Sequence, residues 1–546
     1  ARPSFRRYHG ADSLVRPTMT SLAICTLCML AVVAVTAAQG GAAPTAAPAP
    51  ADPPRVFVSE SCASASAADR EGSVLLQAGI RRAEALLTKS DASRLWKSSF
   101  VSKDTGYGSK STASPRIYEL VKMEAKVESM GAVCLDGSPG AFYISKAPDA
   151  YENKKQWSIH LQGGGWCYDE PTCYNRSVFL GGSSTYALPN RTSNELGIGG
   201  MMSDNCTVNP TFCNFSIVLV WYCDGASFSG NREDPIVYTT SSGSNYSMYF
   251  RGRRILEAVF DTLVDDFNLC EAKEVLFSGD SAGGLGVFNH ANFVERRLLS
   301  CRRAQKAGKH KIKIRMAPGS GFFLFHGNAQ QRMVWQSQMY NIYYLANWTI
   351  TDSACIADRL PQLQWLCLFP EIIYEYVRPP LFILNSALDL YQVAHFLGAE
   401  PITGFPGWEN STVSFWSNYN SSAAPGWETC SGGKAQIQNC GRSQIDAMNL
   451  YMDSFEQALT KSSINKQGNG AFVYGCYNHN AELNSLDYGM YEVNGLSMRE
   501  ALSAWWRSEK HSVVTHTHLE AGRYLYPANV NDSNPSCNYW MDGLVL

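Results

Sequence analysis

The sequence predicts an α/β fold with a mostly parallel sheet flanked by helices, and two observations support this prediction. The 546-residue chain is 45% hydrophobic, which is enough for a large buried core. From about Met130 onward, short strand-like runs alternate with helical stretches, a pattern typical of a parallel sheet. We expect buried strands at 157–162, 216–223, 274–279 and 379–385, and helices at 250–267 and 283–299.

The N-terminal part of the chain has a different composition. Residues 22–38 form an apolar run that ends in small residues, as in a secretory signal, and the run is short for a membrane span. Arginines upstream of it also fit a signal anchor, and Met19 is an alternative start. We expect a leader and signal in 1–38, a Pro/Ala linker in 39–56, an extension in 57–129 and the main domain in 130–546.

Two further features favour export from the cell. Two of the 17 cysteines lie in the apolar run, and the remaining 15 are dense enough to indicate an oxidising compartment. N-x-S/T sequons, which suit a glycosylated protein, occur at Asn175, Asn190, Asn205, Asn214, Asn245, Asn347, Asn410, Asn420 and Asn531. The odd cysteine count leaves one thiol free or paired between chains. We expect a secreted protein, or one held at the membrane if the apolar run is retained.

Charge and cysteine spacing argue against two other classes of protein. The formal net charge is −2 and no long basic run occurs, so we expect no nucleic-acid partner. No C-x2-C pair occurs outside the apolar run, and the H-x-H at 516–518 has no accompanying carboxylate or cysteine pattern. We therefore expect no metal site.

A glycine-flanked serine follows the third predicted strand. In SGDSAGG, Ser281 lies between Gly279 and Gly283 as G-x-S-x-G, with a strand before it and a helix after it. This context is typical of the nucleophile elbow of α/β-hydrolases, where the helix N-terminus favours a developing oxyanion. A chymotrypsin-like site would need an all-β fold with its histidine and aspartate ahead of the serine, whereas only His9 and His160 precede Ser281.

A second glycine-rich loop follows the first predicted strand. The stretch HLQGGGWC places Gly163, Gly164 and Gly165 ahead of Trp166. Such loops expose backbone N–H groups toward a tetrahedral intermediate, although a tight turn beneath a packed tryptophan is the alternative. We expect the N–H groups of Gly164, Gly165 and Ala282 to form an oxyanion hole.

An ordered set of motifs over roughly residues 130–540 resembles the pectin acetylesterase/Notum family. The motifs are AVCLDGSPGAFYIS, GGGWC, NPTFCNFSIVLVWYCDGASFSG, YFRGRRILEAV, SGDSAGGLG, SGFFLF, CLFP, PLFILNSALDLYQ and CYNH. GGGWC is closer to the plant pectin acetylesterase form than to the GGWYC of animal Notum. The resemblance implies an α/β-hydrolase-like, disulfide-containing esterase that needs no metal or organic cofactor.

The acid and base of a catalytic triad are expected after Ser281, in that order. Asp389 is the only acid in the loop after the fourth predicted strand and matches the family's acidic position, although it could instead cap the next helix. Among the later histidines, His395, His479, His511, His516 and His518, His479 matches the family's C-x-x-H. Asn480 departs from the family's H-C-Q, so a disulfide expected there is absent, which offers one explanation of the odd cysteine count.

The resemblance also suggests two disulfides and a substrate. By motif order and local spacing, Cys167 is expected to pair with Cys173, and Cys355 with Cys367. The implied substrate is an O-acetylated polysaccharide such as pectin, deacetylated by Ser281, His479 and Asp389. Two alternatives stay open: a Notum-like deacylase that removes a fatty acyl group from a secreted protein, and a catalytically idle binding protein on the same scaffold.

Overall fold

The chain is described here from a computed structural model. The structure describes residues 116–508 apart from 153–154, 180, 305–311, 351–352, 400–425, 428–429, 431–438, 462–465 and 467, together with 516–519 and 536–537. The predicted leader, signal or anchor segment and linker lie outside these ranges. Residues 57–115 of the predicted extension lie outside them as well.

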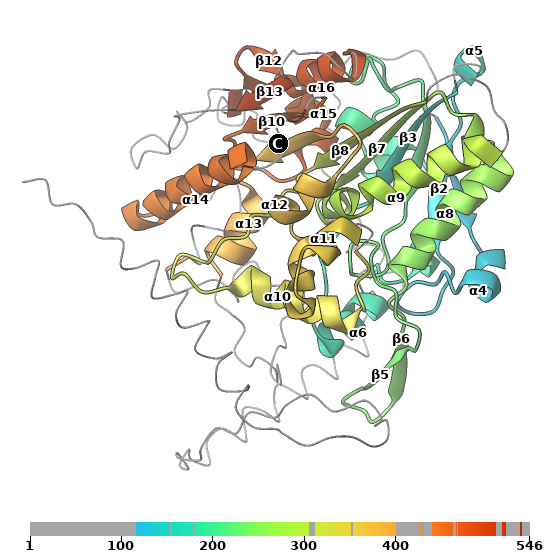
Figure 1. Cartoon of the computed structure of the whole chain (residues 1–546), viewed down its shortest axis with the longest axis horizontal. Helices are drawn as coiled ribbons and strands as arrows, with labels where there is room; N and C mark the ends of the chain where they lie inside the picture. Colours follow the sequence, from blue (N-terminus) through green and yellow to red (C-terminus); the bar gives the residue numbers. More distant parts are fainter. Residues whose placement is uncertain are drawn as a thin grey trace, which may run out of the picture. The chain divides into compact units, whose positions relative to one another are not determined.

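A nine-stranded sheet runs through the described part of the chain (Figure 1). Its order is β1-β2-β4-β3-β7-β8-β9-β10-β13, and the strands from β4 to β13 are parallel, whereas β1 and β2 pair antiparallel at one edge. The strands are β1 (Glu119–Lys122), β2 (Ala141–Ser145), β3 (Gln156–Leu161), β4 (Ser216–Val220), β7 (Glu274–Asp280), β8 (Lys313–Gly319), β9 (Phe382–Ser386), β10 (Gly470–Tyr474) and β13 (His516–Leu519). The α/β-hydrolase-like fold predicted from the sequence is confirmed.

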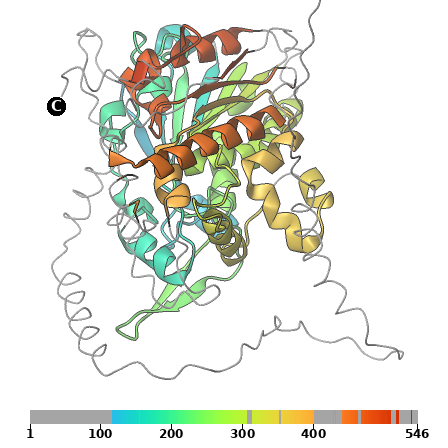
Figure 2. The ribbon, with the colours of Figure 1, turned by 90° about the vertical axis from the view of Figure 1, so that its left-hand side faces the viewer.

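Helices cover both faces of this sheet. Figures 1 and 2 show α8 (Gly252–Phe267), α9 (Ala282–Ala304) and α14 (Arg442–Lys461) on one face and α16 (Met498–Arg507) on the other. Helix α8 buries an apolar stripe at helical spacing, which includes Ile255, Val259 and Leu263. Burial on both faces explains why the central strands are continuous apolar runs. All four predicted strands and both predicted helices are present.

The remaining elements are short and lie in the connections. They are α4 (Ala125–Met130), α5 (Asp149–Glu152), α6 (Glu170–Phe179), η1 (Ser184–Tyr186), α7 (Ser193–Leu196), η2 (Gly200–Met202), β5 (Ile236–Thr239), β6 (Asn245–Met248), η3 (Leu269–Glu271), α10 (Val334–Leu345), α11 (Ser353–Ala357), η4 (Pro361–Leu368), α12 (Pro370–Ile373), η5 (Tyr374–Tyr376), α13 (Leu390–Gln392), η6 (Val393–Leu397), η9 (Ala481–Leu483), α15 (Ser485–Met490), β11 (Glu492–Val493) and β12 (Leu496–Ser497). None of the described helices combines the length and hydrophobicity that a membrane crossing requires.

The sheet begins earlier in the chain than residue 130, where we expected the main domain to start. Strand β1 lies within the predicted extension, yet it pairs with β2 over four residues, from Glu119 opposite Ile144 to Lys122 opposite Ala141. Its four residues, ELVK, are charged at both ends and exposed there, as is typical of an edge strand. Such a short, half-polar strand gives no clear apolar alternation in the sequence.

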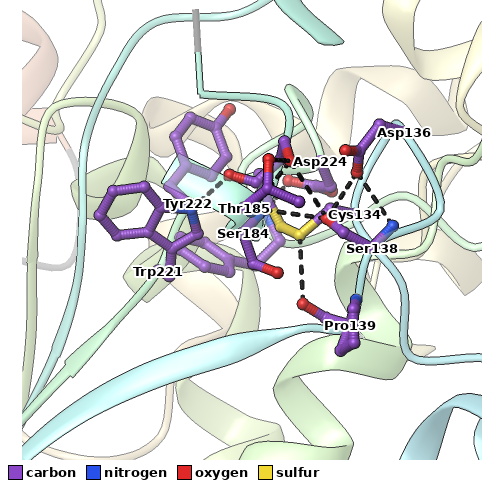
Figure 3. The surroundings of a disulfide bond; sticks show 12 residues. Cys134, Asp136, Ser138, Pro139, Ser184, Thr185, Trp221, Tyr222 and Asp224 are labelled. Carbon is purple, nitrogen blue, oxygen red and sulfur yellow. Dashed lines mark hydrogen bonds between the residues drawn. A yellow bond between two sulfur atoms is a disulfide. The ribbon is translucent and has the colours of Figure 1, made fainter. Parts of the chain in front are cut away.

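Seven disulfides brace the described part of the chain. The bond between Cys134 and Cys223 joins the segment before β2 to the end of β4, and the Asp136 carboxylate beside it accepts hydrogen bonds from Ser138 (Figure 3). The other pairs are Cys167–Cys173, Cys206–Cys213, Cys270–Cys301, Cys355–Cys367, Cys430–Cys440 and Cys476–Cys537. Of the 15 cysteines beyond the apolar run, only Cys62 is not among these, and it lies outside the described residues.

Candidate active site

Ser281 lies on a sharp turn between β7 and α9. Its φ is +53°, a left-handed conformation that costs energy for a residue with a side chain. The turn requires glycine on both sides, because a Cβ on Gly279 would lie 2.5 Å from the Gly283 carbonyl oxygen, and one on Gly283 would lie 2.0 Å from that of Leu161. The predicted strand–turn–helix context of the serine is therefore present.

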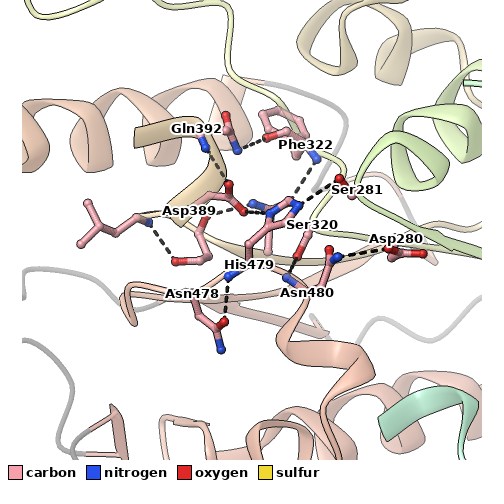
Figure 4. Close-up of polar contacts among 12 residues, drawn as sticks. Asp280, Ser281, Ser320, Phe322, Asp389, Gln392, Asn478, His479 and Asn480 are labelled. Atoms are coloured by element: carbon pink, nitrogen blue, oxygen red, sulfur yellow. Dashed lines mark hydrogen bonds and ion pairs between the residues drawn. The ribbon is translucent and has the colours of Figure 1, made fainter. Parts of the chain in front are cut away.

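His479 and Asp389 lie in line with this serine (Figure 4). The Nε2 atom of His479 is 2.9 Å from Ser281 Oγ, and its Nδ1 atom is 2.7 Å from Asp389 Oδ2. Asp389 follows β9 and His479 follows β10, so both residues lie beyond the carboxyl ends of neighbouring parallel strands. The structure thus brings together the three residues expected to form the triad.

Asp389 also caps the next helix, which was the alternative role considered for it. Its Oδ1 atom accepts a hydrogen bond of 2.9 Å from the Gln392 N–H and so caps α13, while Oδ2 receives the imidazole. The side chain is fully buried. One carboxylate therefore caps the helix and orients the histidine, and the cap fixes the direction in which Oδ2 points.

The surroundings of His479 favour its protonated form. Burial lowers the pKa of the imidazole, but the charge and hydrogen bond of Asp389, together with the charges of Glu482 and Asp280, outweigh burial, so the pKa is raised above its usual value. The ring of Tyr391 stacks on the imidazole with centroids 5.3 Å apart. These contacts fix the ring plane and stabilise the imidazolium that forms when the histidine accepts a proton.

The three residues expected to form an oxyanion hole have free backbone N–H groups. Those of Gly164, Gly165 and Ala282 donate to no acceptor within the described part of the chain. Their carbonyl oxygens are held by hydrogen bonds from Arg176 Nη1, Tyr222 Oη and Ser227 Oγ at 2.7–2.8 Å. Because the Gly164 carbonyl belongs to the same peptide group as the Gly165 N–H, the contact from Arg176 fixes this donor in advance, as stabilisation of a developing negative charge requires.

The tryptophan that follows the three glycines is also packed, as expected from the alternative interpretation of this loop as a tight turn beneath a packed tryptophan. Trp166 is fully buried, and its indole N–H donates to Ser227 Oγ at 2.8 Å. The same Ser227 hydroxyl donates to the carbonyl oxygen of Ala282. The packed tryptophan therefore ties the glycine loop to the start of α9 and helps to position the loop beside the serine.

The structure also gives the places of the other residues that the sequence analysis singled out. The structure contains the two disulfides expected there: Cys167–Cys173 directly follows the glycine loop, and Cys355–Cys367 joins α11 to η4. Histidines 516 and 518 lie on the edge strand β13. Within the described ranges, no group of three or more His, Cys, Asp or Glu residues is placed to hold a metal ion.

Sequence reasoning did not find the buried polar residues that surround the triad. His160, Asp280 and Glu482 are at most 5% exposed. Burial raises the pKa of Glu482 to about 8, with a further increase from the charge of Asp280. The one signal in the sequence was His160, an ionisable residue in a buried strand, which is unexpected unless a partner lies on the neighbouring strand.

Known proteins resemble this chain in sequence. The sequence model of the family described as "PAE: Pectinacetylesterase" matches residues 117–529. The chain belongs to the pectinacetylesterase family. Pectin acetylesterase 5 of Arabidopsis thaliana is 26% identical over 73% of this chain and 82% of its own length. The palmitoleoyl-protein carboxylesterase NOTUM of Schmidtea mediterranea is 25% identical over 71% of this chain and 63% of its own length.

A solved structure shares the fold. The Wnt deacylase Notum from Drosophila superposes with a TM-score of 0.53 at 21% identity, over 72% of this chain and 93% of that one. The family match and these relatives together show that this pectinacetylesterase family member is a carboxylic ester hydrolase.

Proposed function

We propose that the protein is a secreted serine carboxylesterase that removes acetyl groups from an O-acetylated, pectin-like polysaccharide. The observation that carries the proposal is the unbroken chain of hydrogen bonds from Asp389 through His479 to Ser281. A serine hydroxyl becomes a useful nucleophile only with such a base beside it. A catalytically idle scaffold would have no need to keep all of these groups in register.

The proposed mechanism uses this geometry in two half-reactions. Ser281 Oγ attacks the ester carbonyl carbon while His479 Nε2 accepts its proton, and the N–H groups of the glycine loop and Ala282 stabilise the oxyanion. His479 then protonates the departing sugar oxygen, which leaves an acetyl-enzyme. Water, deprotonated by His479, attacks the acetyl carbon, and acetate leaves as the proton returns to Ser281.

Aromatic packing beside the triad supports a small acyl group. Phe323 lies 6.5 Å from His479 between ring centroids and packs against Trp166, Trp335 and Phe396, all of which are at most 2% exposed. Trp335 and Phe396 stack with centroids 4.3 Å apart. A long acyl chain entering from this side would have to displace tightly packed rings, which is costly in a close-packed interior.

Acyl-chain selectivity tests the substrate proposal. We expect kcat/KM for p-nitrophenyl esters to fall from acetate through butyrate to octanoate, and acetate to be released from acetylated but not from saponified pectin. A long acyl pocket would instead gain about 0.8 kcal/mol per buried methylene. Efficiency that rises steadily with chain length would replace the acetylesterase proposal with a Notum-like deacylase, because relatives named as palmitoleoyl-protein carboxylesterases also match.

We also propose the secretory route and the domain plan expected from the sequence, with the catalytic domain now extended to include β1. Seven disulfides suit an oxidising compartment, and three sequon asparagines, at 190, 245 and 347, are exposed. Expression in a eukaryotic secretory host should yield glycosylated protein in the medium. Full retention in the membrane fraction would favour the signal anchor instead.

A further inference from the structure

The carboxylate of Asp280 connects the two loops that flank the nucleophile. Asp280 ends β7, directly before Ser281, and is 5% exposed. Its Oδ1 atom lies 2.8 Å from the Gly163 N–H and 3.1 Å from His160 Nε2, and its Oδ2 atom lies 3.1 Å from Asn480 Nδ2. Gly163 begins the glycine loop, whereas Asn480 follows the base directly in the chain.

On the side of the glycine loop, the carboxylate binds the N–H group of Gly163. Gly163 approaches Asp280 so closely that a Cβ there would lie 2.4 Å from Oδ2. The Gly163 N–H donates to this carboxylate, whereas the N–H groups of Gly164 and Gly165 do not. His160 supports the carboxylate from β3, and its other ring nitrogen lies 2.9 Å from Ser278 Oγ.

On the side of the base, Asn480 is held at two points (Figure 4). Its side-chain amide donates to Asp280 and its backbone N–H donates to Ser320 Oγ at 2.9 Å. Its φ of +62° is left-handed, so the chain turns sharply immediately after His479. The position of the imidazole therefore depends on a turn that Asp280 anchors.

We propose that Asp280 is a positioning residue that holds the glycine loop and His479 in fixed positions on either side of Ser281. The inference rests on the proposed function, because it assigns Asp280 to the two groups on which the serine mechanism depends. Asp280 sits beside the reacting serine but takes no proton in the mechanism. Its contribution is to hold Gly163 and Asn480 at fixed places relative to Ser281.

Two substitutions of Asp280 separate positioning from stability. Asp280→Ala removes all three contacts, and we expect kcat for p-nitrophenyl acetate to fall about 100-fold with KM changed less than threefold, since small misplacements cost this much. Asp280→Asn keeps the acceptor for Gly163 and His160. The Asn480 side-chain oxygen has no partner in the described structure, so the Asn480 amide can rotate by 180° and accept a hydrogen bond from the new Nδ2 group. All three contacts are then kept, and we expect activity within about tenfold of wild type.

Asn292→Ala is the matched control. Asn292 is a buried polar residue of α9 that bonds the Tyr376 carbonyl and the Arg378 N–H, both at 2.8 Å, and it lies 11 residues beyond Ser281, or about 16 Å along the helix axis. This variant should lower the melting temperature without changing kcat. A kcat for Asp280→Ala equal to that of wild type, measured per folded molecule, would show that Asp280 is structural only.

A double-mutant cycle tests whether Asp280 and Asn480 act as one unit. Asn480→Ala alone should lower kcat, and adding it to Asp280→Ala should cost little more, because the amide has already lost its acceptor. If the two losses instead multiply, the residues act independently and the proposed coupling is wrong. Both variants should be compared with wild type at a temperature at which all remain folded.

Labelling with a fluorophosphonate probe separates failure of this inference from failure of the proposed function. The probe reacts with an activated serine, so wild type should label, Asp280→Ala should label about 100-fold more slowly, and Ser281→Ala should not label. Equal labelling of Asp280→Ala and wild type would overturn the role of Asp280 alone. Labelling of Ser281→Ala at the wild-type rate would overturn the proposed nucleophile.

Discussion

The Nε2 atom of His479 lies 2.9 Å from the Oγ atom of Ser281, although the two residues are 198 positions apart in the chain. Parallel strands explain how they meet, because β7 and β10 belong to one sheet and both residues follow the carboxyl ends of their strands. The contact depends on the strand order of the whole sheet. The contact between His479 and Ser281 can therefore form only when the sheet is correctly folded.

Loss of the nucleophile should abolish activity without unfolding the protein. Ser281→Ala removes the attacking oxygen, and we expect ester turnover to fall by about three or more orders of magnitude with an unchanged circular dichroism spectrum. Ser300→Ala, an exposed serine near the end of α9, is the matched control and should keep full activity. An alanine variant at 281 that is folded and active would rule out the elbow assignment.

The histidines should differ sharply in their effect. His479→Ala should lower kcat about as much as Ser281→Ala, because the nucleophile then has no base. His516→Ala and His518→Ala should leave kcat unchanged, since both residues lie on the edge strand β13. The measurement is kcat for p-nitrophenyl acetate at pH 8. A sensitive His518 with an insensitive His479 would place the base in the C-terminal segment.

Asp389→Asn should change both the rate and its pH dependence. The carboxylate raises the pKa of His479 above its usual value against the effect of burial, and the histidine must be neutral to act as a base. In wild type, kcat/KM should therefore fall with decreasing pH through a midpoint above 6.5. Asparagine removes the charge, so we expect this midpoint to move to lower pH while the plateau falls about 10³- to 10⁴-fold. An unmoved midpoint would mean that a different group controls the acid limb.

The strands and the strand–turn–helix context of the serine could be predicted from the sequence because each has a local signature, whereas His479 was expected from the resemblance to the family's C-x-x-H. Ser281 needs its glycines, and Asp389 follows an apolar run. The contact between His160 and Asp280 has no such signature, because it requires β3 and β7 to be neighbours with His160 opposite Ser278. This pairing of β3 with β7 depends on the strand order of the whole sheet and on the burial of both its faces. The local pattern of residues in the sequence does not encode either of these.

The two disulfides expected near the site should differ in their consequences. Replacing Cys355 and Cys367 by alanine opens a loop of 12 residues and should destabilise the protein by about 3 kcal/mol, with activity kept at low temperature. Replacing Cys167 and Cys173 should also lower kcat, because this pair directly follows Trp166 of the glycine loop. Non-reducing peptide mapping should show both pairs, and a free thiol at any of the four positions would reject that pair.

Glu482 should make the protein less stable at alkaline pH. Burial raises its pKa to about 8 from 4.5, so the folded state binds a proton that the unfolded state releases between these values. The stability that this proton provides is complete below about pH 4.5 and is lost as the pH rises through about 8, by at most about 5 kcal/mol.

Glu482→Gln removes this dependence by replacing the neutral acid with a neutral amide of the same shape. We expect the variant to match wild type in urea unfolding at pH 5 and to be more stable at pH 8.5. Glu500→Gln is the control of opposite sign: hydrogen bonds from Ser497 lower the pKa of Glu500, so glutamine there should remove stability that wild type has at neutral pH. If Glu482→Gln and wild type lose stability in parallel between pH 5 and 8.5, Glu482 is already ionised in the folded protein and the predicted contribution of its proton is wrong.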